Sequence, residues 1–184
     1  KLATQLEKEF PNNVLKKDVP WPAARRLWLA RMHAVSSSFI NEEIKRRTHG
    51  VNIALERRGE MDFHDLKFRL TAKADRIDQG KDGLRLYDYK ASKPPSLGDI
   101  QYFDKQLQLE AMIAFHSGFN KIQKQSIEHL EYISLGPDLK KQAIDIDDQE
   151  VSKILNEFRS LILIYNDTNK GFTARDKIQF LKHM

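Results

Sequence analysis

Residues 74–90 read ADRIDQGKDGLRLYDYK, and this stretch decides the expected fold. The turn at residues 79–83 contains an Asp-Gly pair, which favours a turn because glycine tolerates positive φ, so the stretch predicts a β-hairpin. Side chains two apart in a strand point to the same side, which places Asp88 and Lys90 on one face. Asp75 ends the preceding segment, where it could close the same site across the hairpin.

This grouping has the chemistry of a metal-dependent site that acts on phosphate. Two carboxylates can hold a hard divalent cation, and a neighbouring lysine can orient a water or offset negative charge on a phosphate. The alternative is a set of solvated charges on an edge strand. Leu84 and Leu86 share a face with Asp88 and Lys90, so the acidic pair must emerge where that apolar face reaches a cleft. Asp78 is expected to be a structural residue of the hairpin.

The remaining pattern predicts helices and strands in alternation, hence an α/β or α+β domain with a mixed sheet. Trp21 and Trp28 belong to the apolar stripe of the first long helix, where core packing is expected and base stacking is the alternative. We expect residues 1–50 to form a helical extension that packs on a core of residues 51–184. The segments are a break at 11–13, helices over 21–48, 51–58, 97–117 and after Asp147, and strands over 65–73, 84–90, 128–135 and 142–146.

The composition narrows the function classes. The chain has 184 residues, of which 40% are hydrophobic and 31% charged, which is typical of a globular domain. Without cysteine it cannot hold a disulfide, a thiolate zinc site or an iron–sulfur cluster ligated by cysteine. Because no apolar run is long enough to cross a bilayer, no membrane partner is expected. The first residue is lysine rather than methionine, so we expect a fragment of a larger protein.

A net charge of +5 suits a polyanionic partner, although a solvated helical face explains the same charges equally well. The candidates for contacts with DNA are Arg46, Arg47, Arg57, Arg58 and Lys93.

Three motifs in order resemble the RecB-type nuclease module of the PD-(D/E)XK superfamily, and most closely its AddB branch. They are LTAKADRID at residues 70–78, DYKASKPPS at 88–96 and QLQLEA at 106–111. The resemblance is strongest over residues 56–119. It implies a restriction-endonuclease-like fold: a mixed β-sheet flanked by α-helices, here with the helical extension at the N-terminus.

The resemblance also implies a role for each matching residue. Asp75 and Asp88 would be metal ligands, with the carbonyl of Tyr89 as a further ligand, and Lys90 would position or activate the attacking water. Gln106 would lie near the scissile phosphate. Glu110 falls where many relatives have tyrosine, although glutamate looks usual in the AddB branch.

A glutamate on the preceding helix often completes such a site. Glu56 is our choice for this third carboxylate, and Glu60 is the alternative, because no motif fixes the register between Gly59 and Asp75.

The expected function is a Mg²⁺-dependent DNA nuclease, with Mn²⁺ as a substitute, that degrades single-stranded DNA fed to it by a helicase partner. The resemblance implies a bacterial, cytoplasmic protein at the nucleoid that acts in double-strand-break repair and recombination. The main alternative is a DNA-binding scaffold with a nuclease-like fold and no catalysis. A stand-alone exonuclease of the same chemistry is a third possibility.

Overall fold

The computed structural model describes residues 2–10, 17, 19, 21–136 and 138–169. Within these residues no helix has both the length and the apolar character needed to cross a membrane. The expected break at 11–13 and the chain after 169 lie outside the described residues. The elements are α1 (Leu2–Phe10), α3 (Pro22–His49), β1 (Gly50–Phe63), the 3-10 helix η2 (His64–Leu66), β2 (Phe68–Gly80), β3 (Leu84–Lys90), α4 (Leu97–Tyr102), α5 (Gln106–Phe115), β4 (Ile127–Ser134), β5 (Lys141–Ile144) and α6 (Asp148–Asn166).

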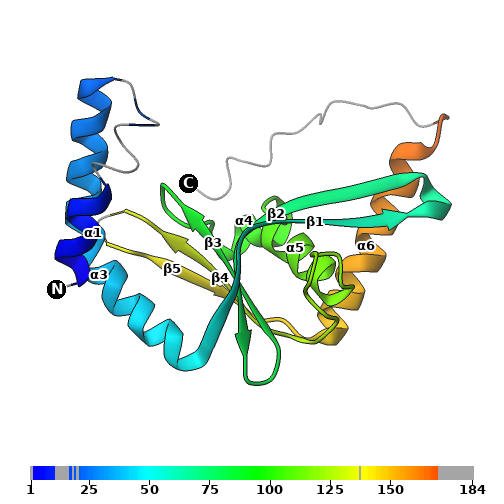
Figure 1. Cartoon of the computed structure of the whole chain (residues 1–184). Coiled ribbons are helices and arrows are strands. Elements are labelled where there is room, and N and C mark those ends of the chain that lie inside the picture. The colour runs from blue at the N-terminus through cyan, green and yellow to red at the C-terminus, as the bar shows by residue number, and fades with distance from the viewer. Residues whose placement is uncertain (1, 11–16, 18, 20, 137, 170–184) are drawn as a thin grey trace.

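A five-stranded sheet in the order β1-β2-β3-β4-β5 forms the centre of the molecule (Figure 1). Strands β3 and β4 are parallel, whereas the other three neighbouring pairs are antiparallel. The parallel pair needs a crossover, which α4 and α5 provide. The structure confirms the expected mixed sheet flanked by helices.

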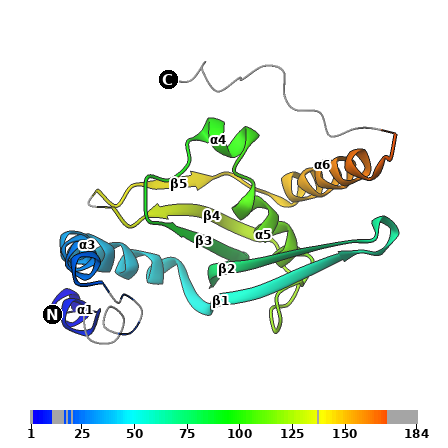
Figure 2. The ribbon, with the colours of Figure 1, turned by 90° about the horizontal axis from the view of Figure 1, so that it is seen from above.

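Each face of the sheet has its own core. On one face, Leu84 and Leu86 of β3 pack with α5 and α6 in the larger hydrophobic cluster. On the other face, Val35 of α3 packs against Tyr87 and Ile133. In Figure 2 the long helix α3 lies beside the end of the sheet opposite to α6. Alternate residues of β3 therefore face different helices, as the period of two requires.

Ionic contacts also attach α3 to the sheet. Glu43 of α3 forms an ion pair with Arg76 of β2, and the Arg76 guanidinium donates hydrogen bonds to both carboxylate oxygens of Asp78 at 2.7 and 2.8 Å. The Asn52 amide donates a further hydrogen bond to Asp78 at 3.0 Å. Asp78 is fully buried in this network, in keeping with the structural role expected from the sequence.

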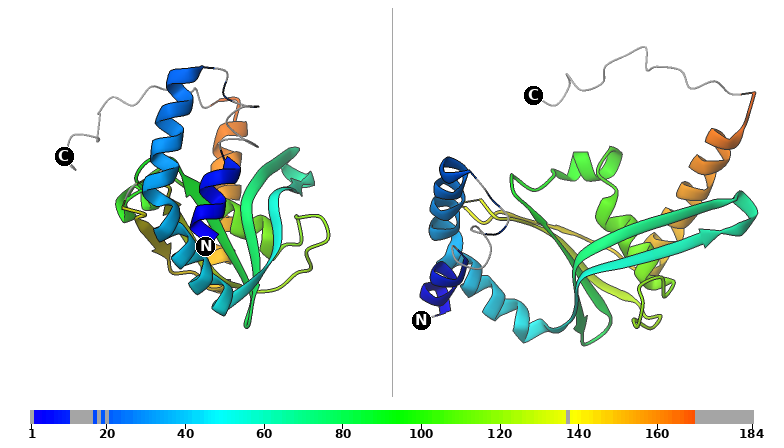
Figure 3. Two further views of the ribbon diagram at one scale, coloured as in Figure 1. Left: turned by 60° about the vertical axis from the view of Figure 1, so that its left-hand side comes forward. Right: turned by 45° about the horizontal axis from the view of Figure 1, so that its top comes forward.

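Strand β2 pairs with β3 only from Arg76 to Gln79, and its earlier residues pair with β1 alone. The residues of β3 beyond Tyr87 pair only with β4. We call this separation of β2 from β3, between Asp75 and Asp88, the fork. Past the fork, β1 and β2 continue as a two-stranded ribbon toward α6 (Figure 3), where the Phe158 ring lies 5.6 Å from Phe63.

Residues 51–58 form part of strand β1, so the helix expected there is wrong. The segment contains Ala, Leu, Glu and Arg, which favour helices when judged locally. In the folded chain, β1 pairs with β2 from Gly50 opposite Gly80 to Phe63 opposite Phe68. This pairing with the strand that follows the η2 turn outweighs the local preference for a helix.

The helix expected over residues 97–117 is divided into α4 and α5 by the short segment 103–105. Its predicted start is confirmed, because Ser96 and Asp99 form a reciprocal capping box. The Asp147 side chain caps α6 as expected by accepting a hydrogen bond from the Glu150 amide at 2.7 Å.

Trp28 of α3 and Trp21, which precedes this helix, are on the surface, which contradicts the expected core packing. Trp21 is 70% exposed and Trp28 is 38% exposed. The stripe continues inward only at later residues, of which Val35 is buried. The division into an extension and a core at residue 50 stays a prediction.

Glycine in the β2–β3 turn is required for space rather than for an unusual backbone angle, since no described glycine has positive φ. A Cβ on Gly83 would lie 2.3 Å from the carbonyl oxygen of Ser126. That carbonyl accepts a hydrogen bond from the Leu84 amide at 2.9 Å, so the turn is held directly against the chain that enters β4.

We expect Gly83→Ala to lower the free energy of unfolding by about 1–3 kcal/mol, because backbone atoms must separate to admit the methyl group. Gly98→Ala is the matched control, since its Cβ would meet nothing closer than 3.8 Å. Urea unfolding of both variants measures the difference. Equal stabilities would contradict the close approach at Gly83.

Candidate active site

Two carboxylates meet at the fork. The Oδ2 atom of Asp75 accepts a hydrogen bond from the Tyr89 amide at 2.8 Å, in place of a bond between the two strands. Asp88 follows the buried Leu84 and Leu86 on the same face of β3 and is itself only 2% exposed. The apolar face of the strand therefore ends in a buried carboxylate, with the carboxylate of Asp75 nearby.

Lys90 and Gln106 form a closed set of contacts with Asp88. Lys90 Nζ lies 2.9 Å from Asp88 Oδ2 as an ion pair, and it donates a hydrogen bond to Gln106 Oε1 at 2.9 Å. The Gln106 amide nitrogen in turn donates to Asp88 Oδ1 at 2.8 Å. The lysine ammonium is thus held beside the carboxylate by partners from β3 and α5.

Tyr132 of the neighbouring strand β4 contacts Lys90 and helps to place the start of α5. The parallel register places Tyr132 beside Asp88, and Lys90 Nζ lies 5.1 Å from the centre of its ring. Its hydroxyl donates to Asp104 at 2.8 Å and accepts from the Leu107 amide at 3.2 Å, which fixes the start of α5. Sequence reasoning missed Tyr132 and Asp104. The period of two in β4 identifies its inward residues, but only the β3–β4 register identifies the one next to Asp88.

Glu110 lies one helical turn after Gln106 and is 2% exposed. The Gln106 amide donates to its Oε1 atom at 3.1 Å, whereas its Oε2 atom accepts no hydrogen bond from the described part of the chain. Burial, together with the negative charges of Asp88 and Asp75, raises the pKa of Glu110 to about 7. Burial also raises the pKa of Asp88, although Lys90 opposes this shift. The site therefore concentrates buried negative charge.

The structure separates the two candidates for a third carboxylate. Glu56, on β1 rather than on a helix, lines a cavity of about 510 Å³ together with Asp75 and Tyr89. Its φ of 49° is in the left-handed region, and its carboxylate forms an ion pair with Lys73. Glu60 lines a different cavity, beyond the fork. Glu56 is therefore the candidate beside Asp75.

The five residues expected to contact DNA do not form one surface. The expected DNA contact of Arg46 is wrong, because this residue is 6% exposed. Its guanidinium lies 5.7 Å from the centres of the Phe39 and Tyr87 rings. Its burial in the α3 core leaves it no access to a phosphate. Sequence reasoning missed this because Arg46 lies between Lys45 and Arg47, which are both exposed basic residues.

The other four lie in three places. Arg47 is exposed and forms an ion pair with Glu43 at 2.7 Å. Arg57 is half-buried on β1, and Arg58 lines the cavity that contains Glu60. Lys93 lines a cleft beside Tyr89, close to the fork.

The donor chemistry of the site fits a hard divalent cation. Asp75 and Asp88 offer carboxylate oxygens, and a cation would offset the negative charge that includes Glu110. In the described residues, no three His, Cys, Asp or Glu side chains are grouped closely enough to hold a metal ion by themselves. The two aspartates, with a backbone carbonyl such as that of Tyr89 and oxygens from water or substrate, are the groups available.

We expect Glu110→Gln to flatten the dependence of stability on pH. A raised carboxyl pKa means that the folded chain binds the proton more tightly than the unfolded chain, so stability falls as the pH rises from 4.5 to about 7. Between pH 5 and pH 8 the free energy of unfolding should therefore fall by up to about 3 kcal/mol less in Glu110→Gln than in the wild type, at 1.36 kcal/mol per pKa unit.

Urea unfolding in metal-free buffer at the two pH values measures this difference. Glu157→Gln on the exposed side of α6 is the control. Parallel curves for the wild type and Glu110→Gln would show that the buried carboxyl has no raised pKa.

Three curated relatives from Rickettsia are similar to the chain. An uncharacterized protein of Rickettsia typhi is 26% identical over 113 residues, which are 59% of this chain and 13% of the relative. A protein of Rickettsia bellii is 26% identical over 113 residues, which are 59% of this chain and 14% of the relative. A protein of Rickettsia conorii is 26% identical over 120 residues, which are 63% of this chain and 14% of the relative. The matched region is thus a small part of each relative.

The sequence model of the PD-(D/E)XK nuclease superfamily matches residues 1–177, nearly the whole chain. The fork, its two aspartates and Lys90 lie within the matched region, on a mixed sheet consistent with the restriction-endonuclease-like fold. The chain therefore belongs to the PD-(D/E)XK nuclease superfamily.

Proposed function

We propose that this chain is a Mg²⁺-dependent deoxyribonuclease that hydrolyses phosphodiester bonds in single-stranded DNA at the fork. The observation that carries the proposal is the closed contact set of Asp88, Lys90 and Gln106 beside Asp75. Proteins of this superfamily generally use divalent metal ions, and Asp75 and Asp88 would hold the ion here. When bound, the cation supplies positive charge that offsets the charge building on the phosphate.

The side chains supply the remaining requirements of hydrolysis. A phosphodiester is anionic and repels a nucleophile, so the attacking water must be oriented close to the phosphorus atom. Lys90 is a point charge held in place by Asp88 and Gln106, and it can donate a hydrogen bond to that water or to a phosphate oxygen. Gln106 positions Lys90 and Asp88 relative to each other.

The same proposal extends to the cellular role. We infer a module of a bacterial helicase–nuclease that degrades single strands in double-strand-break repair and recombination, in the cytoplasm at the nucleoid. Support comes from the motif resemblance to the AddB branch and from relatives much longer than the matched region. Mn²⁺ is expected to replace Mg²⁺, since both accept oxygen ligands.

A scaffold without catalysis is the second candidate, and one observation favours it. The Glu56 carboxylate forms an ion pair with Lys73, so in this arrangement it is not free to act as a third metal ligand in the cavity beside Asp75. A degenerate site would bind DNA but not cut it. The assay below therefore has to measure binding and cleavage separately.

Lys90→Ala should reduce cleavage of end-labelled single-stranded DNA about a hundredfold or more, because it removes the positioned ammonium. Lys153→Ala is the matched control, since Lys153 is exposed on α6 and forms an ion pair with Glu150. Cleavage is measured with Mg²⁺, with Mn²⁺ and with EDTA, and binding is measured with EDTA.

Full activity in Lys90→Ala would contradict the assigned centre. If the wild type binds the strand but cuts it with neither metal, the scaffold is the better explanation. A duplex of the same sequence, assayed in parallel, tests the preference for single strands.

Glu56→Gln should raise the Mg²⁺ concentration for half-maximal cleavage about 10- to 100-fold if Glu56 supports the metal, whereas Glu60→Gln should leave it unchanged. Both glutamates are on β1, so they form a matched pair. A Mg²⁺ titration of the cleavage rate distinguishes them. The opposite result would assign the third carboxylate to Glu60.

A further inference from the structure

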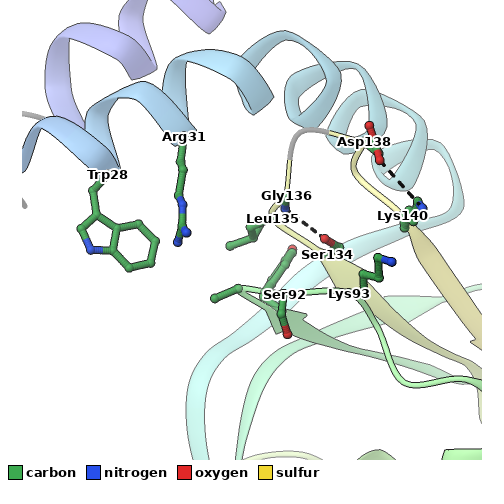
Figure 4. A pocket seen from close by; sticks show the side chains of 11 residues that line it. Trp28, Arg31, Ser92, Lys93, Ser134, Leu135, Gly136, Asp138 and Lys140 are labelled. Atoms are coloured by element: carbon green, nitrogen blue, oxygen red, sulfur yellow. Dashed lines mark hydrogen bonds and ion pairs between the residues drawn. The ribbon is translucent and has the colours of Figure 1, made fainter. Parts of the chain in front are cut away.

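A cleft lies between α3 and the ends of β3 and β4, apart from the contact set around Asp88. Its volume is about 400 Å³, within the range of roughly 300–1,000 Å³ for ligand pockets. Figure 4 shows Trp28 and Arg31 projecting from α3 on one side of the cleft, with Ser92 and Lys93, which follow β3, on the other. The wall is completed by Ser134 at the end of β4 and by Leu135, Gly136, Asp138 and Lys140 after it.

An aromatic ring is exposed at this cleft rather than packed in a core. Trp28 keeps 38% of its surface exposed. The Arg31 guanidinium lies over its ring, 5.2 Å from the centre, which is the geometry of a cation–π contact. Trp28 thus combines an arginine on its ring with a substantial exposed surface at the cleft.

The charged groups around the ring are mainly cationic. Arg31 and Lys93 form no ion pair with any residue that the structure describes. Lys140 lies 3.8 Å from Asp138, in a loose and exposed pair. Three cations against one carboxylate, around an exposed indole, suit an anionic ligand that carries aromatic groups.

The cleft adjoins the fork. Tyr89 and Leu135 line both the cleft and the cavity that contains Asp75 and Glu56. Lys93 follows Lys90 by three residues, which a chain spans in at most about 11 Å. A ligand in the cleft could therefore extend to the reactive centre.

We propose that this cleft binds the unpaired nucleotides next to the scissile phosphate, with a base stacked on Trp28 and flanking phosphates held by Arg31 and Lys93. The inference rests on the proposed nuclease function and specifies where the unpaired strand lies. Bases in a duplex are stacked on each other, so only an unpaired base presents its face to an indole. The occupant is single-stranded DNA.

Binding of a fluorescein-labelled oligothymidylate to the 184-residue chain tests this, by anisotropy in EDTA so that no cleavage occurs. Trp28→Ala should weaken binding about 5- to 150-fold, the fold-change that corresponds to loss of one stacked base. Trp21→Ala is the matched control, because Trp21 is exposed immediately before the same helix but does not line the cleft. Trp28→Phe should restore part of the affinity.

An abasic strand of equal length separates stacking from charge. Trp28→Ala should bind it as the wild type does, whereas Arg31→Ala and Lys93→Ala should each weaken binding of both strands and reduce the salt slope by about 1. In Trp21→Phe, Trp28 is the only tryptophan, and its fluorescence should be quenched by the thymidine strand but not by the abasic strand.

The proposal is overturned if the wild type does not bind the strand, or if Trp28→Ala and Trp21→Ala bind it equally well. Cleavage is scored separately, so the two hypotheses fail independently. Normal cleavage with a binding affinity insensitive to Trp28 would reject the cleft and keep the nuclease. Trp28-dependent binding without cleavage would keep the cleft and reject the nuclease.

Discussion

The hydrogen bond from the Tyr89 amide to Asp75 lies at the point where β2 leaves β3. A strand that separates from its neighbour exposes amide and carbonyl groups that require partners. Here a carboxylate takes the place of the missing strand. The same residue that satisfies the backbone is therefore placed beside Asp88, and the ribbon, the cavity and the acidic pair all depend on this separation.

The second constraint is the charge buried around that point. Asp88 and Glu110 are both nearly inaccessible, and burial raises the pKa of each. Lys90 offsets part of this charge, and Gln106 bridges all three side chains. A buried carboxylate without a full set of partners reduces stability, which a domain tolerates where function requires it. The concentration of buried, partly neutralised carboxylates therefore identifies the site more clearly than any single residue does.

The sequence was sufficient where structure depends on nearby residues. The hairpin, the capping box at Ser96 and the cap at Asp147 are local, and each is found where the pattern placed it. Strand β1 could not be predicted in this way, because its own residues favour a helix and its pairing with β2 contains a register shift between Asn52 and Ala54. The site divides similarly: the β3 residues follow from the period of two, whereas the place of Tyr132 beside Asp88 depends on register.

Burial of long side chains was the least predictable property. Arg46 and Arg47 are adjacent on the same helix, yet one is enclosed by aromatic rings and the other is exposed. Which side of α3 meets the sheet decides this, and basic residues alone do not reveal it. The same rotation of the helix leaves Trp28 outside the core.

Helix α3 contacts the two halves of the site at once. Its Glu43 binds Arg76, the neighbour of Asp75, while Trp28 lies four turns earlier along the same rigid element. Because one continuous helix carries both residues, a displacement of its Trp28 end would also act on the Glu43–Arg76 ion pair. Helix α3 is therefore a direct mechanical link between the cleft and the strand that carries Asp75.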